Sequence, residues 1–451
     1  MTDASLPNGN AAPKSGSLHE IDARTKKRNA AEKRFRMYGV AAIATGIIFL
    51  LVLLFAILSN GLGAFQQTFV SVPVYLDEAK LDKKGNRNID DIKKVSTFGY
   101  NPLIQKAVLK AVEDAGIETP LKKSKDMKAL ISASAAAQVR QAVLDNPALI
   151  GQTVEFRFLA SSRVDGYLKG RVHRELLARD KNIDAEHLDI VDGLKEIGVV
   201  KKTFNSAFIF GADASESRAE QAGIGVSMIG SLFMMLVVLF LALPIGVAAS
   251  IYLEEFAPKN RWTDLIEVNI SNLAAVPSIV FGILGLAVFI QFMHLPQSAP
   301  LVGGLVLTLM TLPTIIISTR ASLKAVPPSI RDAALGVGAS KMQSVFHHVL
   351  PLAAPGILTG TIIGLAQALG ETAPLLLIGM VGYIASNPPG GVIEGLMSPN
   401  SAMPAQIYEW AKRADPAYYE RAWGGIIILL IFLVSMNTLA VLLRRRFERR
   451  W

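Results

Sequence analysis

The sequence predicts an all-α polytopic membrane protein of six transmembrane helices, with an α+β domain inserted after the first helix. Three observations predict this fold class. Of the 451 residues, 51% are apolar and only 18% charged, and the mean hydropathy is +0.38, whereas soluble chains carry more charge. The apolar residues cluster in six runs, and a helix of about 20 such residues crosses the hydrocarbon of a bilayer. One long polar segment, 61–222, separates the first run from the other five.

The six apolar runs define the predicted spans. The first is too long for the core of a cleaved signal peptide, so we predict an uncleaved anchor helix at 38–60. Pro244 in the second run and Pro374 in the fifth predict kinks. The runs are Tyr38–Leu58, Gly223–Ile251, Ile270–Phe292, Leu301–Thr319, Ala354–Ile384 and Trp423–Leu443.

Basic residues beside the spans predict the orientation, because cytoplasmic loops are enriched in Lys and Arg. Segment 1–37 combines a Gly-, Pro- and Ser-rich start, which predicts disorder, with a basic run at 24–36. Segment 444–451 is a second basic tail. We therefore predict that both termini are cytoplasmic and that 61–222 lies on the opposite side of the membrane.

The inserted segment 61–222 has α+β patterning. Phe69–Leu76 and Val154–Leu159 predict strands, and Pro102–Ala115 and Lys125–Leu144 predict helices. Its lysines and carboxylates form no catalytic or metal-binding constellation. Two roles stay open for this domain: a spacer or lid on the membrane part, and a docking surface for a soluble binding protein.

A polar loop at 327–353 joins the fourth and fifth spans. Pro327–Pro328 ends one helix, Ser329 is the expected N-cap of a short helix, and Gly338 is the expected turn. A second helix is expected from Ser340 to Val349, ending at Pro351. An ordinary amphipathic hairpin at the membrane surface would have the same local features, so chemistry alone leaves that alternative open.

The order of residues in this loop resembles the EAA loop of ABC-importer permeases, against which a partner ATPase docks. Asp332 stands for the usual glutamate, and His348 replaces an isoleucine. The small side chains of Ala333 and Ala334 are expected to let a partner backbone approach closely. The resemblance implies that the ATPase-coupling residues are Arg331, Asp332, Ala333, Ala334, Gly338, Leu350 and Pro351.

Three further segments, Tyr252–Pro258, Asn272–Gly282 and Gly370–Leu376, are similar to the phosphate-importing branch of that family. The resemblance covers about 223–443 plus the anchor helix. It implies a non-catalytic permease subunit that forms half of a path for inorganic phosphate. The implied partners are a second, related permease, two copies of an ATPase subunit and a soluble phosphate-binding protein. No cofactor is expected in this chain, since the ATPase would bind ATP and Mg.

The energy source must lie outside the chain if ATP drives transport. The sequence has no G-x-x-x-x-G-K-[ST] motif and no Gly-Lys pair at all, so it has no P-loop.

A candidate translocation path centres on Glu371, the single acidic residue in the fifth run. A carboxylate within a span is costly and functional by default, so it is expected to face a cavity or a polar partner. The family often has arginine where this chain has Gln367, which leaves Arg320 as the candidate cation. Thr372 offers a hydroxyl.

Three other classes of function would have their own sequence features. An ABC permease for sulfate, molybdate or another solute would share the coupling loop. A secondary transporter would show inverted repeats and paired intramembrane charges, and the sequence shows neither. A membrane-tethered enzyme or sensor built on 61–222 would not need five spans after the domain. No nucleic-acid partner or metal site is predicted.

Overall fold

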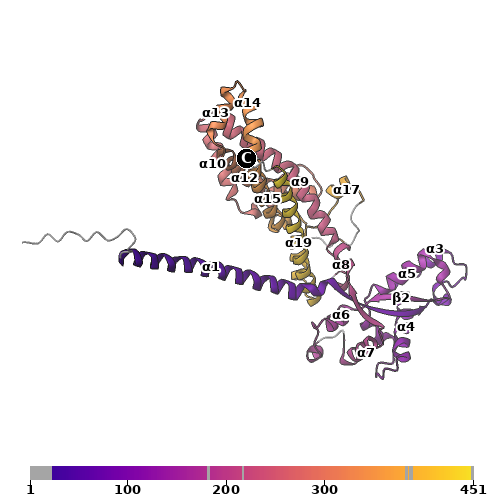
Figure 1. The fold of residues 1–451 in the computed structure, drawn as a ribbon. Coiled ribbons are helices and arrows are strands. Elements are labelled where there is room, and N and C mark those ends of the chain that lie inside the picture. Colours follow the sequence, from indigo (N-terminus) through magenta and orange to yellow (C-terminus); the bar gives the residue numbers. More distant parts are fainter. Residues whose placement is uncertain (1–22, 180–182, 216–217, 381–383, 385–389, 448–451) are drawn as a thin grey trace, which may run out of the picture. The chain divides into compact units, whose positions relative to one another are not determined.

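The computed structural model describes residues 23–179, 183–215, 218–380, 384 and 390–447, in two compact units, Met1–Ala56 and Ile57–Trp451. The first unit is built from helix α1, Ala23–Gly61, an unbroken helix whose last turn belongs to the second unit (Figure 1). The helix therefore begins at Ala23 rather than at Tyr38 and includes the basic run at 24–36. The rest of the predicted disordered tail, 1–22, lies outside the described residues, as does 448–451 at the other end.

Among the described residues, five helices are long and apolar enough to cross a membrane, and a bent pair would make a sixth. Four of the five lie wholly in the second unit: α9 (Gly225–Ile251), α12 (Pro300–Lys324), the continuous helical segment Lys341–Gly370, and α19 (Pro416–Phe447). The predicted count of spans therefore depends on the bent pair.

That bent pair contains the third predicted span. Helix α10 (Arg261–Ala274) and the segment formed by α11 (Ser278–Gly285) and a π-helical stretch (Leu286–Phe292) meet at 100°. The residues of the third predicted span, Ile270–Phe292, are therefore divided between two helices, and they make a span only if the bent pair crosses as one unit. Pro277 has no N–H to continue the helix and disfavours helical geometry at the residue before it, which explains the break.

Close contacts through glycines hold α12 against its neighbours. A Cβ at Gly246 of α9 would lie 2.7 Å from a side-chain atom of Ile315 on α12. On α15 (Leu350–Gly370), Gly356 and Gly360 lie against Ser322 and Ser318 of α12. Because packed helices this close cannot separate without losing their contacts, α12 and α15 are expected to move together.

The inserted domain contains a three-stranded antiparallel sheet in the order β2-β1-β3. The strands are β1 (Gln66–Tyr75), β2 (Thr153–Leu159) and β3 (Val200–Phe204), with Val72 opposite Phe156 and Val70 opposite Val200. The two predicted strands are confirmed. Strand β3 was missed because two consecutive lysines, Lys201 and Lys202, interrupt its apolar pattern.

Helices α4 (Asn101–Asp114), α5 (Ala135–Asp145) and α7 (Ala185–Glu196) share one apolar core with the strands. The predicted helix Lys125–Leu144 is divided into a 3-10 segment, Ser124–Leu130, and α5, since Ile131 forms a bridge with Ala160 instead. The smaller helices are α2 (Glu78–Leu81), α3 (Ile89–Lys93), α6 (Ser162–Leu168), α8 (Ser206–Phe210), α16 (Ala373–Leu377), α17 (Val392–Met397) and α18 (Met403–Lys412).

Buried charges fasten this domain to the start of α19. Lys169, next to the end of α6, contacts Asp165 at 2.6 Å and Glu420 of α19 at 2.8 Å, and all three side chains are at most 5% exposed. Arg171 also pairs with both carboxylates. A buried network of this kind fixes one geometry, because losing any member leaves an unpaired charge.

Candidate functional site

The loop between α12 and α15 has the predicted turn but different helix ends. Helix α13 runs over Pro328–Gly336 with Pro327 as its N-cap, so Ser329 lies inside the helix and the predicted cap was wrong. Gly338 has φ +90°, a conformation that favours glycine, and the predicted turn is confirmed. Ser340 caps α14 (Lys341–Ser344) in a capping box with Gln343.

The helix after this turn does not stop at Pro351. A π-helical turn, Val345–Val349, leads directly into α15, whose first turn contains Leu350 and Pro351. Proline is tolerated there because its missing N–H falls at a point where the helical hydrogen-bond pattern changes register. The second half of the loop is thus the first part of a membrane helix that runs without interruption over Lys341–Gly370.

Arg331 binds back onto its own chain. Its guanidinium donates to Glu255 Oε1 at 2.7 Å and to the carbonyl oxygens of Leu323 (2.9 Å) and Val326 (2.8 Å). The Glu255 side chain is only 7% exposed. This arrangement caps the end of α12 and ties α13 to the π-helical turn Tyr252–Phe256 that follows α9.

The exposed surface of the loop at 327–353 is partly apolar. Asp332 and Ala333 are exposed, whereas Ala334 is buried within its own chain, and the expected close approach of a partner backbone at these alanines stays a prediction. Apolar side chains share this exposed surface, which is unusual for a loop in water. They are Leu335, Val337, Met342 and Phe346.

Arg320 is already paired. It donates to Glu267 of α10 at 2.6 Å and to Glu254, which follows α9, at 3.3 Å, and Lys324 lies 3.5 Å from the same Glu254 carboxylate. The cluster joins three elements and compensates the charge of Arg320.

Glu371 lies at a helix break. Helix α15 ends at Gly370, Glu371 is extended (φ −74°, ψ 134°), and α16 begins at Ala373 after Thr372. The fifth predicted span, Ala354–Ile384, is therefore not one continuous helix. The Glu371 side chain is half-buried and makes no hydrogen bond or ion pair with any residue in the described ranges, and Gln367 is exposed one turn before it.

Two helix breaks lie at the same level. A Cβ on Gly282 of α11 would lie 2.7 Å from Pro374 Cα, and one on Gly285 would lie 3.3 Å from an Ile378 methyl group. Helices α11 and α16 therefore lie side by side and run in the same direction. The break at 275–277 ends five residues before Gly282, and the break at 371–372 ends two residues before Pro374. At 1.5 Å per residue the two breaks therefore lie within about 5 Å of the same level. Non-helical backbone at membrane depth is tolerated only inside protein or beside a water-filled cavity. The two breaks therefore mark a candidate path.

The structure does not bring the predicted path residues together. Ser318 faces Gly360, and Glu371 lies roughly 16 Å further along α15 at 1.5 Å per residue. Arg320, near Ser318, is therefore well separated from Glu371, and it belongs to the region of the coupling loop rather than to the helix breaks.

Sequence reasoning missed the carboxylates that organise this region: Glu254, Glu255 and Glu267. Glu254 and Glu255 form an acidic pair beside a short loop, opposite a loop with Arg320, Lys324 and Arg331. The opposite charges of these two loops were the sequence signal that the loops contact each other. It does not say which residues pair.

A further buried carboxyl lies in the inserted domain. Glu220 is 6% exposed and accepts a short hydrogen bond from Ser132, and burial raises the pKa of its carboxyl above the usual value. Because ionised Glu220 is disfavoured in the folded state, its contribution to stability is complete below the unfolded pKa and is lost as pH rises through the folded pKa.

Glu220→Gln is therefore expected to raise stability near neutral pH and to flatten the stability profile at pH values above the unfolded-state pKa of glutamate, about 4.3, since glutamine can still accept a hydrogen bond from Ser132. Thermal unfolding of the purified protein across that range measures the effect. Glu113→Gln, on the exposed side of α4, is the matched control. An unchanged profile in Glu220→Gln would contradict this assignment.

Comparison with known proteins gives two family matches. Residues 242–451 match the family described as a binding-protein-dependent transport system inner membrane component, and residues 22–178 match a domain of unknown function, DUF3333. Among solved structures, an inward-facing MetNI methionine ABC transporter aligns with 50% of this chain and 95% of its own chain at 16% identity and a TM-score of 0.37.

Curated relatives are more similar. The phosphate transport system permease protein PstA of Mycobacterium leprae is 32% identical over 51% of this chain and 72% of its own length. PstA 1 of Mycobacterium tuberculosis (strain CDC 1551 / Oshkosh) is 31% identical over 51% and 72%. PstA of Yersinia pestis is 28% identical over 48% and 71%.

The family match over residues 242–451, the similarity to the phosphate transport permeases and the membrane helices define the class: this is the permease subunit of an ABC transporter, a membrane protein of a non-catalytic family. Within that class, the chain belongs to the PstA family of phosphate transport system permease proteins.

Proposed function

We propose that this chain forms half of the membrane path of an importer of inorganic phosphate and couples to a separate ATPase through the loop at 327–353. The proposed complex contains a second permease, PstC, two copies of the ATPase PstB, and the soluble phosphate-binding protein PstS. In this arrangement the chain lies in the bacterial inner membrane with both termini cytoplasmic and 61–222 periplasmic. The domain boundaries proposed from sequence, 38–60, 61–222 and 223–443, follow this topology.

One observation supports the coupling role best. The second part of the loop forms one unbroken helix with α15, and Arg331 holds the loop to the ends of α9 and α12. The exposed apolar side chains of the loop leave a surface for a partner. A force applied to α13 and α14 would therefore reach α15 and the break at Glu371 directly. The ATPase would supply that force, because this sequence has no nucleotide-binding motif.

Coupling can be tested on the surface of the loop. Charge reversal of Asp332 combined with Gly338→Val is expected to leave ATP hydrolysis by the complex but to uncouple it from transport. Valine is strained at φ +90°, and Asp332 lies on the exposed face. ATPase and uptake rates are measured on the same proteoliposomes. Full coupling in this variant would refute the assignment, and Lys80→Glu, an exposed charge reversal in the inserted domain, is the control.

The path is proposed to pass the two helix breaks. Among the residues that the structure describes, none pairs with the Glu371 side chain, and Thr372 and Gln367 add polar groups beside it. A carboxylate repels phosphate, so the compensating positive charge is proposed to come from the second permease. Arg320 is bound to two carboxylates and is proposed to stabilise the ends of α10 and α12 rather than to meet phosphate.

Glu371→Gln is expected to reduce phosphate uptake at least about tenfold without loss of assembled complex, since a carboxylate at membrane depth is retained for function. Uptake of radiolabelled phosphate in cells and the yield of purified complex are measured together. Glu394→Gln, an exposed carboxylate on α17, is the control with the same chemical change. Normal uptake in Glu371→Gln would remove this residue from the path.

The cargo is tested by competition. In a strain that lacks this protein, restored uptake of phosphate should be competed by phosphate and not by sulfate or molybdate. A protonophore separates an ATP-driven importer, which continues to work while ATP is present, from a secondary transporter, which stops. Competition by sulfate or molybdate would replace the phosphate proposal with another ABC cargo.

A further inference from the structure

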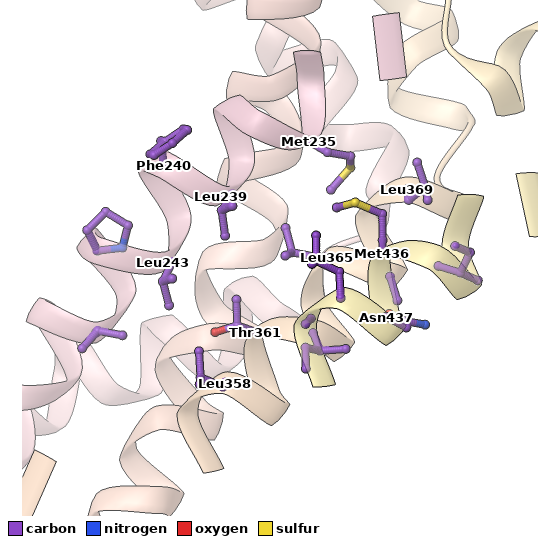
Figure 2. Close-up of a pocket in the computed structure, with 17 residues that line it drawn as sticks. Met235, Leu239, Phe240, Leu243, Leu358, Thr361, Leu365, Leu369, Met436 and Asn437 are labelled. Carbon is purple, nitrogen blue, oxygen red and sulfur yellow. The ribbon is translucent and has the colours of Figure 1, made fainter. Parts of the chain in front are cut away.

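A groove between three membrane helices has no role in the proposed transport path. Its volume is about 570 Å³, and Figure 2 shows side chains of α9, α15 and α19 converging on it. Phe240 (71% exposed) and Leu439 (56% exposed) lie at its rim, so the groove opens on the surface of the chain. The lining is apolar apart from Thr361 and Asn437, and the Thr361 hydroxyl already donates to the Ile357 carbonyl.

One end of the groove carries a cation. Arg444 follows Ala440, a lining residue, by one helical turn on α19 and therefore lies on the same side of the helix. Its guanidinium donates to the Thr359 hydroxyl on α15 at 2.9 Å, while its Nε is buried without a hydrogen-bond partner.

Arg444 differs from the other partly buried arginines of the membrane part. Arg320, Arg331 and Arg413 each bind a carboxylate. Within the ranges that the structure describes, Arg444 has no carboxylate partner. Arg421 of α19 is buried and within the same ranges has no carboxylate contact, but its guanidinium donates to the Gln67 side chain and to carbonyl oxygens of Ala64, Ala219 and Glu220. Arg444 has one donor with no such acceptor, and an anion is the acceptor that stabilises a guanidinium most strongly.

The dimensions of the groove fit one leaflet of a bilayer. On α15 the lining extends from Leu358 to Leu369, which is about 16 Å at 1.5 Å per residue. Half of the roughly 30 Å hydrocarbon thickness is about 15 Å. Thr359 and Arg444 lie at the end near Leu358, which the proposed topology places on the cytoplasmic side.

We propose that this groove binds one anionic phospholipid of the cytoplasmic leaflet. An acyl chain lies between α9, α15 and α19, and the headgroup phosphate accepts hydrogen bonds from Arg444 beside Thr359. Basic side chains between membrane helices at the cytoplasmic side are suited to such headgroups. The apolar lining selects a lipid over free phosphate, and the uncompensated charge selects a net anionic headgroup over a zwitterionic one.

The test is native mass spectrometry of the full-length chain, purified with its partner subunits and exchanged into phosphatidylglycerol, phosphatidylethanolamine or a mixture. We expect retained phosphatidylglycerol, and about tenfold less of it in Arg444→Gln, because a charge-assisted hydrogen bond is lost. Arg445→Gln is the matched control, since Arg445 is the exposed neighbour. Ala366→Phe, which fills the groove without touching Arg444, should also release the lipid.

Several outcomes would overturn the proposal. Equal retention in Arg444→Gln and Arg445→Gln would indicate general surface charge, and equal retention of both lipids would indicate ordinary boundary lipid. Inorganic phosphate that displaces the lipid, or binds the delipidated complex at Arg444, would assign the site to free phosphate. A disulfide between Leu239→Cys and a cysteine on the second permease would show that a protein helix occupies the groove. Phosphate uptake is not the readout, so failure here leaves the transport proposal standing.

Discussion

Replacing Glu420 with alanine is expected to destabilise the folded protein by about 3–5 kcal/mol, the usual cost of removing one partner from a buried ion pair. Glu420 is 4% exposed and contacts Lys169 at 2.8 Å and Arg171. Its loss leaves Lys169 with Asp165 alone and Arg171 with the more distant contact at 3.3 Å.

The effect of Glu420→Ala can be measured by thermal unfolding and by limited proteolysis of the inserted domain, which should be cleaved faster in the variant. Glu409→Ala provides the comparison, because the Glu409–Lys412 pair, at 2.9 Å, is exposed on its lysine side and such pairs contribute at most about 1 kcal/mol. If both variants unfolded alike, the buried network would not hold the domain to α19.

Replacing Arg331 with alanine is expected to abolish ATP-driven uptake while the chain still inserts. The variant loses the bonds to Glu255, Leu323 and Val326 together and leaves the Glu255 carboxylate buried and unpaired, at a cost of about 3–5 kcal/mol. The loop would then no longer be fixed to α9 and α12, and a force on it would not reach the membrane helices.

Uptake and ATPase activity of reconstituted Arg331→Ala measure this effect, with Lys324→Ala as the control for an exposed cation in the same region. The double variant Arg331→Ala/Glu255→Ala tests the pair directly, because it removes the uncompensated carboxylate. It should be more stable than Arg331→Ala alone. Wild-type transport in the single variant would show that the anchor is dispensable.

The membrane helices were predictable because hydrophobicity over about 20 residues is a local signal. The breaks were harder to place. Pro277 lay inside a run that is apolar enough to span. In the fifth run Pro374 predicted a kink, whereas the structure has a complete break at 371–372, just before that proline. Where a helix breaks within a membrane depends on which neighbouring backbone can satisfy its free polar groups, and that is decided by tertiary packing.

The charged contacts could not have been predicted from spacing. Lys169 and Glu420 are far apart in the chain, as are Arg331 and Glu255, and each has nearer residues of opposite charge in sequence. In the loop, the turn at Gly338 was predicted correctly. For Arg331 the resemblance indicated only a role in coupling to the ATPase, whereas the structure shows that its guanidinium binds Glu255 and a carbonyl group of its own chain. The missed strand β3 has the same cause, since Lys201 and Lys202 lie on it only because β1 supplies the pairing.

The continuity of Lys341–Gly370 has a mechanical consequence. Thirty helical residues measure about 45 Å. A small rotation of this segment about its α14 end therefore moves its other end, next to Glu371, by a larger distance. A tilt of only about 5° about the α14 end displaces the far end by about 4 Å, which exceeds the radius of a small oxyanion. The amplitude of gating at Glu371 would then be set by the length of this helix, and shortening the helix by one turn would reduce the opening in proportion.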